Sequence, residues 1–336
     1  MEQKKESRKN LRRMLLLSLL FSLTIGIAIS CGGGSGGGDS GSGSDSSGGC
    51  GGGGSPTNNE IVVANAYSIT VYSRTANGDI SPIRKISGPN TGLAISQGIA
   101  VDTVNNEIAV TNLSNTITVY SRTANCNAAP LRTISGANTG VANPLGIAVD
   151  TVNNEIVVAN KAGDSITVYS RTANGDVAPI RKISGSNTAL DSPQGIAVDT
   201  ANNEIVVANL RDSITVYSRT ANGDISPIRK ISGSNTALDN PQGIAVDTAN
   251  NEITVYSRTA NGDVAPIRKI SGPNTGLSYP GGIAVDTVNN EIAVTNYSAG
   301  SITVYSRTAN GDVAPIRKIS GGSTALSYPW GIALLP

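Results

Sequence analysis

The chain repeats one unit of about 48 residues from residue 57 onward, and this repeat restricts the possible folds more than any other feature. Successive copies of the motif Gly-Ile-Ala are separated by 48, 49, 48, 39 and 49 residues. They begin at Gly98, Gly146, Gly195, Gly243, Gly282 and Gly331. A full unit contains four segments of strand length, GIAVD, EIVVAN, SITVYS and IRKIS, bounded by Asn, Gly, Asp or Pro. No window shows a sustained helical period, so the repeats are predicted to be all-β.

Four short strands in a unit of this length are typical of one blade of a β-propeller. The Asn-Gly pair in RTANGDVAP predicts a tight hairpin, because a type I′ turn requires positive φ at both central residues. The small residues of GIAVD suit an innermost strand, where neighbouring blades converge, and the apolar EIVVAN suits a strand covered on both faces. Arg and Lys in IRKIS are expected to protect an exposed outer edge. The alternative, an open β-solenoid, would need capping units and shorter repeats.

The two ends of the repeat array predict a closed ring. The first unit begins at residues 58–61 (NNEI) with no GIAVD before it, and residues 331–336 (GIALLP) form an inner strand with nothing after it. We therefore expect an all-β, six-bladed β-propeller with four-stranded blades, in which the C-terminal strand completes the first blade. This Velcro closure would place both ends of the propeller in one sheet.

The fifth unit is shorter than the others by nine residues, because its EIVVAN and SITVYS segments are fused into EITVYS. This fusion predicts a truncated, three-stranded fifth blade. Without that strand, the outer strand of the blade ends at the opposite end of the sheet. We therefore expect residues 271–281 to run back in an extended conformation to the start of the next inner strand.

Residues 193–209, PQGIAVDTANNEIVVAN, followed by SITVYS, resemble the NHL repeat of six-bladed propellers. The resemblance covers residues 57–336. Ala-Asn replaces the Ala-Asp of that family, and the IRKISGSNT segment lengthens each unit. The resemblance implies a propeller fold, but NHL propellers include binding, signalling and a few enzymatic proteins, so it does not fix the function.

The N-terminal segment is typical of an export signal. Basic residues dominate 1–13, and residues 14–30 form an uncharged run. The sequence Ala-Ile-Ser-Cys that ends at Cys31 resembles the bacterial lipobox, which implies a signal peptide at 1–30 and a lipid-modified Cys31. An uncleaved membrane anchor and plain secretion are the alternatives. By the rule for Gram-negative lipoproteins, Gly32 favours the outer membrane.

Residues 31–56 carry the expected lipidated Cys31 and a tether rich in Gly and Ser, which cannot bury apolar area and behaves as a flexible coil. Residues 57–336 form the expected propeller. A disulfide between Cys50 and Cys126 is possible in an oxidising compartment, but the sequence does not determine it.

Composition excludes several classes of function. The 25 basic and 24 acidic residues include 6 and 2 within the first 30, so the remainder has 19 and 22 and a net charge of −3. A nucleic-acid partner is therefore not expected. The chain has no His, which excludes catalytic triads based on His and His-ligated metals.

The repeated carboxylates favour structural roles. The Asp of each GIAVD could belong to a ring that binds a cation, but an Asp also caps its own turn, and we favour the turn. The Glu of each NNEI is interpreted in the same way, because acid–base catalysis needs two groups in different environments. Related calcium-dependent lactonases with six blades use an unsymmetrical set of Glu, Asn and Asp that is not found here. We therefore predict no catalytic residue, metal or cofactor.

The units differ mainly in the loops between their second and third strands and before each Gly-Ile-Ala, which all emerge at one end of the blades. Loops on a rigid scaffold commonly carry binding, so this variable-loop face is the candidate site. Drift in exposed loops is the alternative. The candidate residues are Trp330, Tyr328, Tyr279, Gln97, Leu145, Gln194, Gln242, Tyr67, Lys161, Arg211 and Tyr297.

Trp330 is the only Trp of the chain and belongs, with its equivalents before each Gly, to a ring expected around one mouth of the central channel. It could anchor a partner or plug the seam of the ring. We predict a monomeric, non-enzymatic binding module, tethered to the cell envelope through its lipid, with an envelope protein or glycan as partner. A lactonase-like hydrolase or lyase is the alternative, and a passive spacer is a third possibility.

Overall fold

The computed structural model describes residues 59–243, 246–247 and 252–335. The chain divides into two units, Met1–Gly49 and Cys50–Pro336, and all described residues belong to the second. The expected signal peptide, Cys31, Cys50 and the tether lie outside the described residues. Within the described part, no helix is long and apolar enough to cross a membrane.

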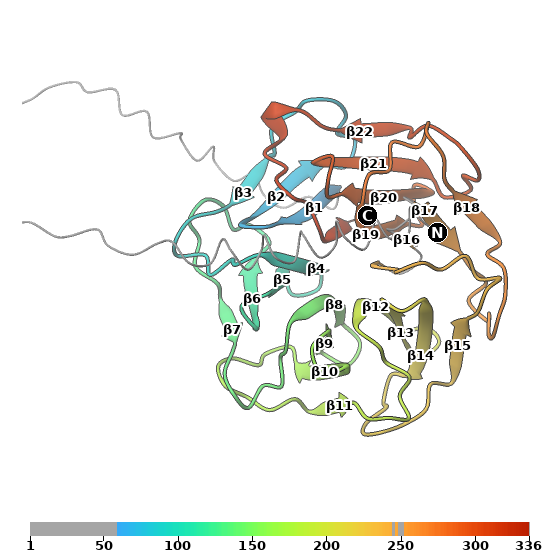
Figure 1. Cartoon of the computed structure of the whole chain (residues 1–336). Helices are drawn as coiled ribbons and strands as arrows, with labels where there is room; N and C mark the ends of the chain where they lie inside the picture. Colours follow the sequence, from blue (N-terminus) through green and yellow to red (C-terminus); the bar gives the residue numbers. More distant parts are fainter. Residues whose placement is uncertain (1–58, 244–245, 248–251, 336) are drawn as a thin grey trace, which may run out of the picture. The chain divides into compact units, whose positions relative to one another are not determined.

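The described residues form strands that occupy repeated positions in successive sheets (Figure 1). The innermost strands are β4 (Ser96–Asp102), β8 (Pro144–Asp150), β12 (Pro193–Asp199), β16 (Val246–Asp247), β19 (Pro280–Asp286) and β23 (Ile332–Leu335). The second strands are β1 (Glu60–Asn65), β5 (Glu107–Asn112), β9 (Glu155–Asn160), β13 (Glu204–Asn209) and β20 (Glu291–Asn296).

The third strands are β2 (Ser68–Ser73), β6 (Thr116–Ser121), β10 (Ser165–Ser170), β14 (Ser213–Ser218) and β21 (Ser301–Ser306). The outer strands are β3 (Arg84–Ile86), β7 (Arg132–Ile134), β11 (Arg181–Ile183), β15 (Arg229–Ser232), β18 (Arg268–Ile270) and β22 (Arg317–Ile319). The remaining elements are the middle strand β17 (Glu252–Val255) and the 3-10 helix η1 (Gly322–Thr324).

The strands form antiparallel sheets around a common centre, with the outer strands at the periphery (Figure 1). Within the described residues, five sheets have four strands and one has three. The prediction of an all-β propeller with four-stranded blades is confirmed. Strand β23 pairs antiparallel with β1, from Glu60 opposite Leu335 to Val63 opposite Ile332. The C-terminal strand thus lies in the sheet of the first unit.

The fifth unit contains the three-stranded sheet, of order β16-β17-β18. Glu252 pairs with Asp247, as second strands do with inner strands, while Ile253 pairs with Ile270, as third strands do with outer strands. One strand therefore makes both sets of pairings. The expected extended return through 271–281 is wrong, because this segment keeps the turn of the other units, including the bond from the Thr275 hydroxyl to the Gly272 carbonyl.

The hydrophobic core consists of layers between adjacent sheets. One layer joins Val157 and Val168 to Ile205 and Val207 from the next unit. Another joins Ile61 of the first unit to residues of the last unit. Among the described residues, the layer between the fourth and fifth units has three buried hydrophobic members, Ile214, Ile231 and Leu238.

A buried Tyr on the third strand crosses five of the layers, and these residues are Tyr72, Tyr120, Tyr169, Tyr217 and Tyr305. The Tyr217 hydroxyl donates to the Thr188 carbonyl at 2.5 Å, and the Tyr72 hydroxyl donates in the same way to Thr324 of the last unit. Burial raises the pKa of both Tyr hydroxyls to about 12. Each bond satisfies a hydroxyl that would otherwise be costly to bury.

In the first outer strand an exposed Lys follows a buried Arg, and in the other outer strands the Arg is half-buried. Lys85 is exposed, as expected for edge protection, whereas only 3% of Arg84 is exposed. The prediction was therefore wrong for the Arg. Alternation along the strand turns neighbouring side chains to opposite faces, and the Arg turns toward a buried carboxylate.

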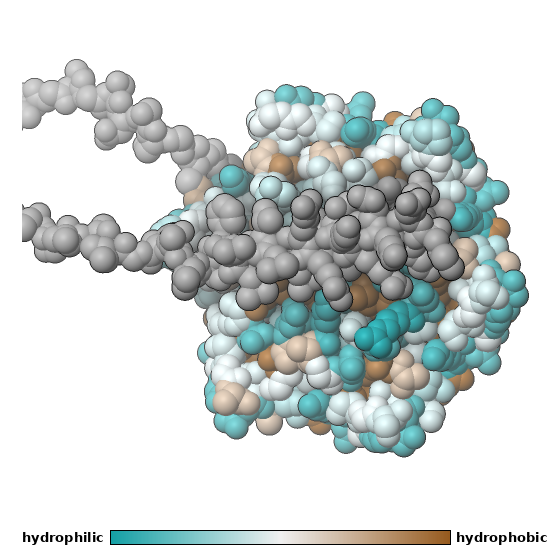
Figure 2. All heavy atoms as spheres, in the orientation of Figure 1, coloured by the Kyte–Doolittle hydropathy of each residue, from teal (hydrophilic) through white to brown (hydrophobic). Residues whose placement is uncertain are grey.

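Surface hydrophobicity is dispersed. On the face shown in Figure 2, hydrophobic side chains lie in separate patches among polar ones, outside the grey atoms. An exposed Ile precedes the outer strand in five units, with Ile83 (49% exposed) and Ile180 (53%) as examples. Scattered residues of this kind are ordinary on soluble proteins.

Candidate functional site

The carboxylates that follow the inner strands cap turns. Asp102 Oδ1 accepts hydrogen bonds from the backbone N–H groups of Val104 and Asn105, both at 2.9 Å. Asp150 and Asp286 make the same contacts in their own units. The prediction that this Asp caps its own turn is confirmed, and these oxygens are already occupied.

The Glu at the start of each second strand forms a buried ion pair. The Arg181 guanidinium donates to both oxygens of Glu155, at 2.7 and 2.6 Å. Four other described units repeat this arrangement in the pairs Glu60–Arg84, Glu107–Arg132, Glu204–Arg229 and Glu291–Arg317. The sequence analysis identified the Glu but missed its Arg partner.

A second Arg reaches these carboxylates from the following sheet. Arg171 Nη1 lies 3.0 Å from Glu107 Oε2, and Arg74 of the first unit contacts Asp286 of the last. Hydrogen bonding from Arg132 and the nearby charge of Arg171 lower the pKa of Glu107. Such a group is a poor general acid at neutral pH. In the part of the chain that the structure describes, no cluster of three or more His, Cys, Asp or Glu could hold a metal ion.

The six residues before the inner-strand glycines lie near the axis, but most contribute backbone rather than accessible side chains. Gln97 (8% exposed), Leu145 (6%) and Gln194 (5%) are buried, and Gln242 is half-buried. The amide of Gln194 donates to the Ser192 carbonyl at 2.9 Å. Gln97 likewise donates to the Ile95 carbonyl of its own loop, and the ring of these six residues around one mouth of the central channel stays a prediction.

Four aromatic side chains meet at the variable-loop face. Tyr297, after β20, lies 5.8 Å from Tyr279, 5.1 Å from Tyr328 and 5.4 Å from Trp330 between ring centroids. Tyr279 and Trp330 are 6.4 Å apart. We call these four residues the aromatic patch. The structure thus brings together four of the predicted site residues from two interblade loops and one loop after a second strand.

The aromatic patch is partly open to solvent. Tyr328 is 57% exposed, whereas Tyr279, Tyr297 and Trp330 are half-buried. Burial raises the pKa of Tyr279 and Tyr297, so both hydroxyls stay protonated at neutral pH. The backbone of Trp330 is fixed, since its N–H donates to the Ala64 carbonyl and its carbonyl accepts from the Thr295 hydroxyl.

Two of these aromatics occupy a strained backbone conformation. Tyr279 and Tyr328 both have a φ of 51°, in the left-handed region. The equivalent residues with similar φ are Ile95, Asn143, Ser192 and Asn240. Asn tolerates this region well and bulky residues do not. Strain of this kind concentrates at functional sites.

The remaining predicted residues do not join the aromatic patch through any ring contact or ion pair that the structure shows among its described residues. Tyr67 is 64% exposed. Lys161 is half-buried, and burial lowers its pKa. Arg211 forms an exposed ion pair with Asp191 at 3.3 Å, which contributes little to stability.

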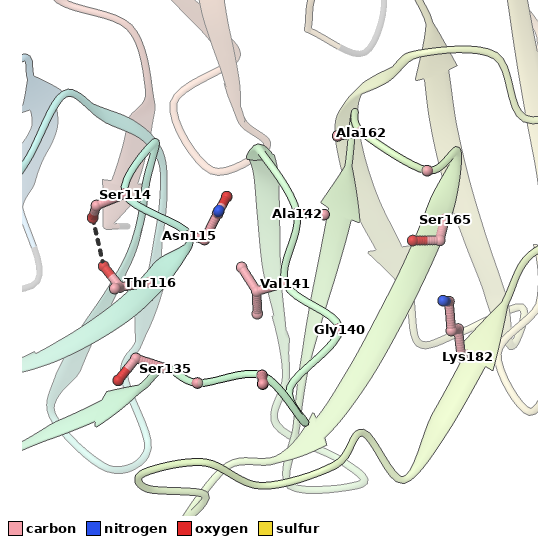
Figure 3. A pocket seen from close by; sticks show the side chains of 13 residues that line it. Ser114, Asn115, Thr116, Ser135, Gly140, Val141, Ala142, Ala162, Ser165 and Lys182 are labelled. Carbon is pink, nitrogen blue, oxygen red and sulfur yellow. Dashed lines mark hydrogen bonds between the residues drawn. The ribbon is translucent and has the colours of Figure 1, made fainter.

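A pocket of about 540 Å³, which the sequence analysis did not identify, lies between the second and third units. Figure 3 shows Ser114, Asn115 and Thr116 on one side, Ser165 and Lys182 on the other. Its polar groups are hydroxyls, one amide and one ammonium, so it lacks a paired acid and base for hydrolysis. No unusual motif marks it in the sequence, because its lining is mostly small residues that recur in other units.

The comparisons with known proteins support the propeller fold but not the number of sheets, since the matching family is described as seven-bladed. A family model described as "Lactonase, 7-bladed beta-propeller" matches residues 108–238. A chain from a crystal structure of a nidogen/laminin complex aligns with a TM-score of 0.57 at 16% identity, over 82% of this chain and 98% of that one. The chain is a β-propeller. The WD40 β-propeller domain of Doa1 also aligns, with a TM-score of 0.52 and 13% identity, over 81% of this propeller chain and 82% of that one. A search of curated proteins finds no match.

Proposed function

We propose that this propeller is a non-enzymatic binding module that contacts its partner through the aromatic patch. The observation that carries this proposal is the meeting of the only Trp with three Tyr at the variable-loop face, two of them on a strained backbone. Rigid aromatic side chains with polar tips are typical anchors of interfaces. An envelope protein or a glycan is the expected partner.

The repeats supply the substitutions that test this proposal. Trp330→Gln and Tyr328→Asn introduce residues that already occupy the equivalent positions in other units, so the fold should tolerate them. If the aromatic patch is the site, both variants keep the wild-type melting temperature and lose retention of envelope components on the immobilised protein. Retention equal to wild type in both variants would contradict the proposal. A lower melting temperature for Trp330→Gln, with unchanged retention, would identify Trp330 as a plug.

A lactonase-like hydrolase is the second candidate. It is supported by the family match over residues 108–238, a span that also contains every residue of the pocket between the second and third units. The Glu carboxylates of the ion pairs described above count against it, because they are already paired with Arg in the same way in several units. The test is turnover of simple lactones, with and without Ca²⁺. Turnover that is lost in Lys182→Met would favour the hydrolase, and absence of turnover favours the binding module.

We further propose that the propeller has six NHL-like blades and is closed by β23. The pairing of β23 with β1 supports this closure. The hydrogen bond from Tyr72 to Thr324 and the contact of Arg74 with Asp286 also support it, since both join the first unit to the last. The fifth blade is the truncated one.

We also propose that the chain is exported and anchored to the cell envelope as a monomer by a lipid on Cys31. The lipobox-like sequence and the Gly/Ser-rich segment behind it support this proposal. Cys31→Ala should abolish acylation and leave an uncleaved precursor, which mass spectrometry of the intact protein detects. An unmodified Cys31 within an intact N-terminus in the wild-type protein would refute it.

A further inference from the structure

We infer that the ligand of the aromatic patch is a neutral glycan; this inference rests on the proposed binding function. It names the chemical class of the partner, which the aromatic residues alone leave open between protein and carbohydrate.

The charge around the aromatic patch favours a neutral ligand. The four segments that surround or adjoin it, 64–69, 276–282, 296–301 and 321–331, contain no charged residue. The variable loops of the third and fourth units differ, because 161–165 contains Lys and Asp and 210–213 contains Arg and Asp. A charged ligand would find its partners there rather than at the aromatic patch.

The chemistry of these segments matches a polyhydroxylated ligand. The three Tyr hydroxyls and the Trp N–H can donate hydrogen bonds, and Ser278, Ser298 and Ser327 add hydroxyls in the same loops. Sugars present hydroxyls at their edges and C–H groups on their ring faces. Aromatic faces and hydroxyl groups in one neutral site therefore complement both parts of a sugar.

The arrangement of the rings favours several short contacts over one flat platform. Tyr297 is tilted by 56° to Tyr279 and by 38° to Tyr328, and it stands at 86° to Trp330. The mutual contacts restrict the side chains before binding, which reduces the entropy lost when a ligand binds. Rings in different orientations suit successive sugar units of an oligosaccharide.

The loops of the aromatic patch also lack one interblade bond that other units have. The N–H of Ser192 donates to Asp164 Oδ1 at 2.6 Å, and that of Asn240 donates to Asp212 at 2.7 Å. The residue at the equivalent place before Tyr328 is Gly300, which has no side chain to accept such a bond. Tyr328 therefore keeps this backbone conformation without the bond that Asn143, Ser192 and Asn240 make. The structure shows no such bond for Ile95 either, where Tyr67 occupies the place of Gly300.

Trp330 provides a site-specific probe, because it is the only Trp of the chain. We would titrate the purified full chain with chitotetraose, cellotetraose and maltotetraose and follow the Trp fluorescence. At least one should give a saturable change, with a dissociation constant that hardly differs between low and high salt, since no charge is involved. Tyr297→Leu should weaken this binding about tenfold or more, as loss of an aromatic contact does.

The control variant is Lys161→Leu, which changes the equivalent residue of the third unit and introduces the Leu found at 113 and 210. It should bind the oligosaccharide as wild type does. Both variants should have the wild-type unfolding midpoint, so that a loss of binding reflects contact rather than folding.

Two sets of outcomes separate this inference from the function on which it rests. If none of the neutral oligosaccharides changes the fluorescence, but heparin or proline-rich peptides bind and Tyr297→Leu abolishes that binding, the ligand class is wrong and the binding function stands. If neutral oligosaccharides bind equally well to wild type and Tyr297→Leu, the site is wrong. If no probe or envelope extract changes the fluorescence, both proposals fail.

Discussion

A methyl group added to Gly331 tests the proposed closure of the ring by β23. Gly331 precedes β23, and an added Cβ would lie 2.4 Å from the Gln97 carbonyl oxygen, next to the inner strand of the second unit. The φ of Gly331 is not positive, so the Gly331→Ala substitution introduces no backbone strain of its own. Any loss of stability in this variant therefore measures how closely one inner strand lies to the next.

The structure also supplies the size of the effect. A Cβ at 2.4 Å from a backbone oxygen is about 1 Å inside van der Waals contact, and backbone yields less readily than a flexible side chain. Overpacking of this kind costs about 1–3 kcal/mol, and we expect Gly331→Ala near the upper end. At Gly243, the nearest atom to an added Cβ is the Gly281 oxygen at 3.1 Å, so Gly243→Ala should cost under about 1 kcal/mol.

Thermal unfolding of the full chain measures both variants. A loss of about 3 kcal/mol lowers the melting temperature of a domain of this size by about 6–12 °C. Gly311→Ala is the conformational control, because Gly311 has a φ of +80° and no heavy atom lies within 4 Å of an added Cβ. It should cost about 1 kcal/mol from backbone strain alone. Equal melting temperatures for Gly331→Ala and Gly243→Ala would show that β23 does not lie against the second unit.

Two further predictions concern the ion pairs and the fifth unit. Its Arg partners lower the pKa of Glu107 below the unfolded value, so its contribution to stability should be complete above about pH 4.3 and lost as the pH falls through the folded pKa. At pH 7, the free energy of unfolding of Glu107→Gln, measured with denaturant, should be about 3 kcal/mol below that of the wild type. The two free energies should converge in acid, and a constant difference at all pH values would contradict the assignment of the ion pair. In hydrogen exchange, the amides of β17 should exchange faster than those of β13, because three buried hydrophobic residues form the described part of the layer between the fourth and fifth units. Equal protection of the two strands would contradict this prediction.

Much of the fold could be predicted because each unit repeats its local signals. Alternating β-branched residues, Asn-Gly turns and the motif Gly-Ile-Ala fix the strands and their order within a unit. The loss of one strand from the fifth unit could also be predicted, since nine residues cannot be removed without removing a strand. The path of 271–281 could not, because the turn is held by local bonds that do not depend on strand direction.

The candidate site was predicted in part. Position in the repeat placed Tyr279, Tyr328 and Trp330 in equivalent loops, and their proximity to Tyr297 followed from the order of the strands. The burial of Gln97 and Gln194 was not foreseen, because residues at equivalent positions were taken to point the same way as Trp330. Gln97 and Gln194 are buried and bond to their own loops, whereas the Trp330 indole is half-buried beside Tyr279 and Tyr297.

The sequence by itself determined the repeat, the strands and the residues at each turn, because these depend on neighbours along the chain. Only the tertiary structure decided which charges are paired. Arg181 and Glu155 lie 26 residues apart, and Arg74 and Asp286 meet from the first and last units. No local pattern encodes such contacts, since the first exists only when β9 and β11 are placed in one sheet and the second only when the first and last units meet. For the same reason the tertiary structure, and not composition, joined Trp330 to Tyr279 and Tyr297 in one neutral site.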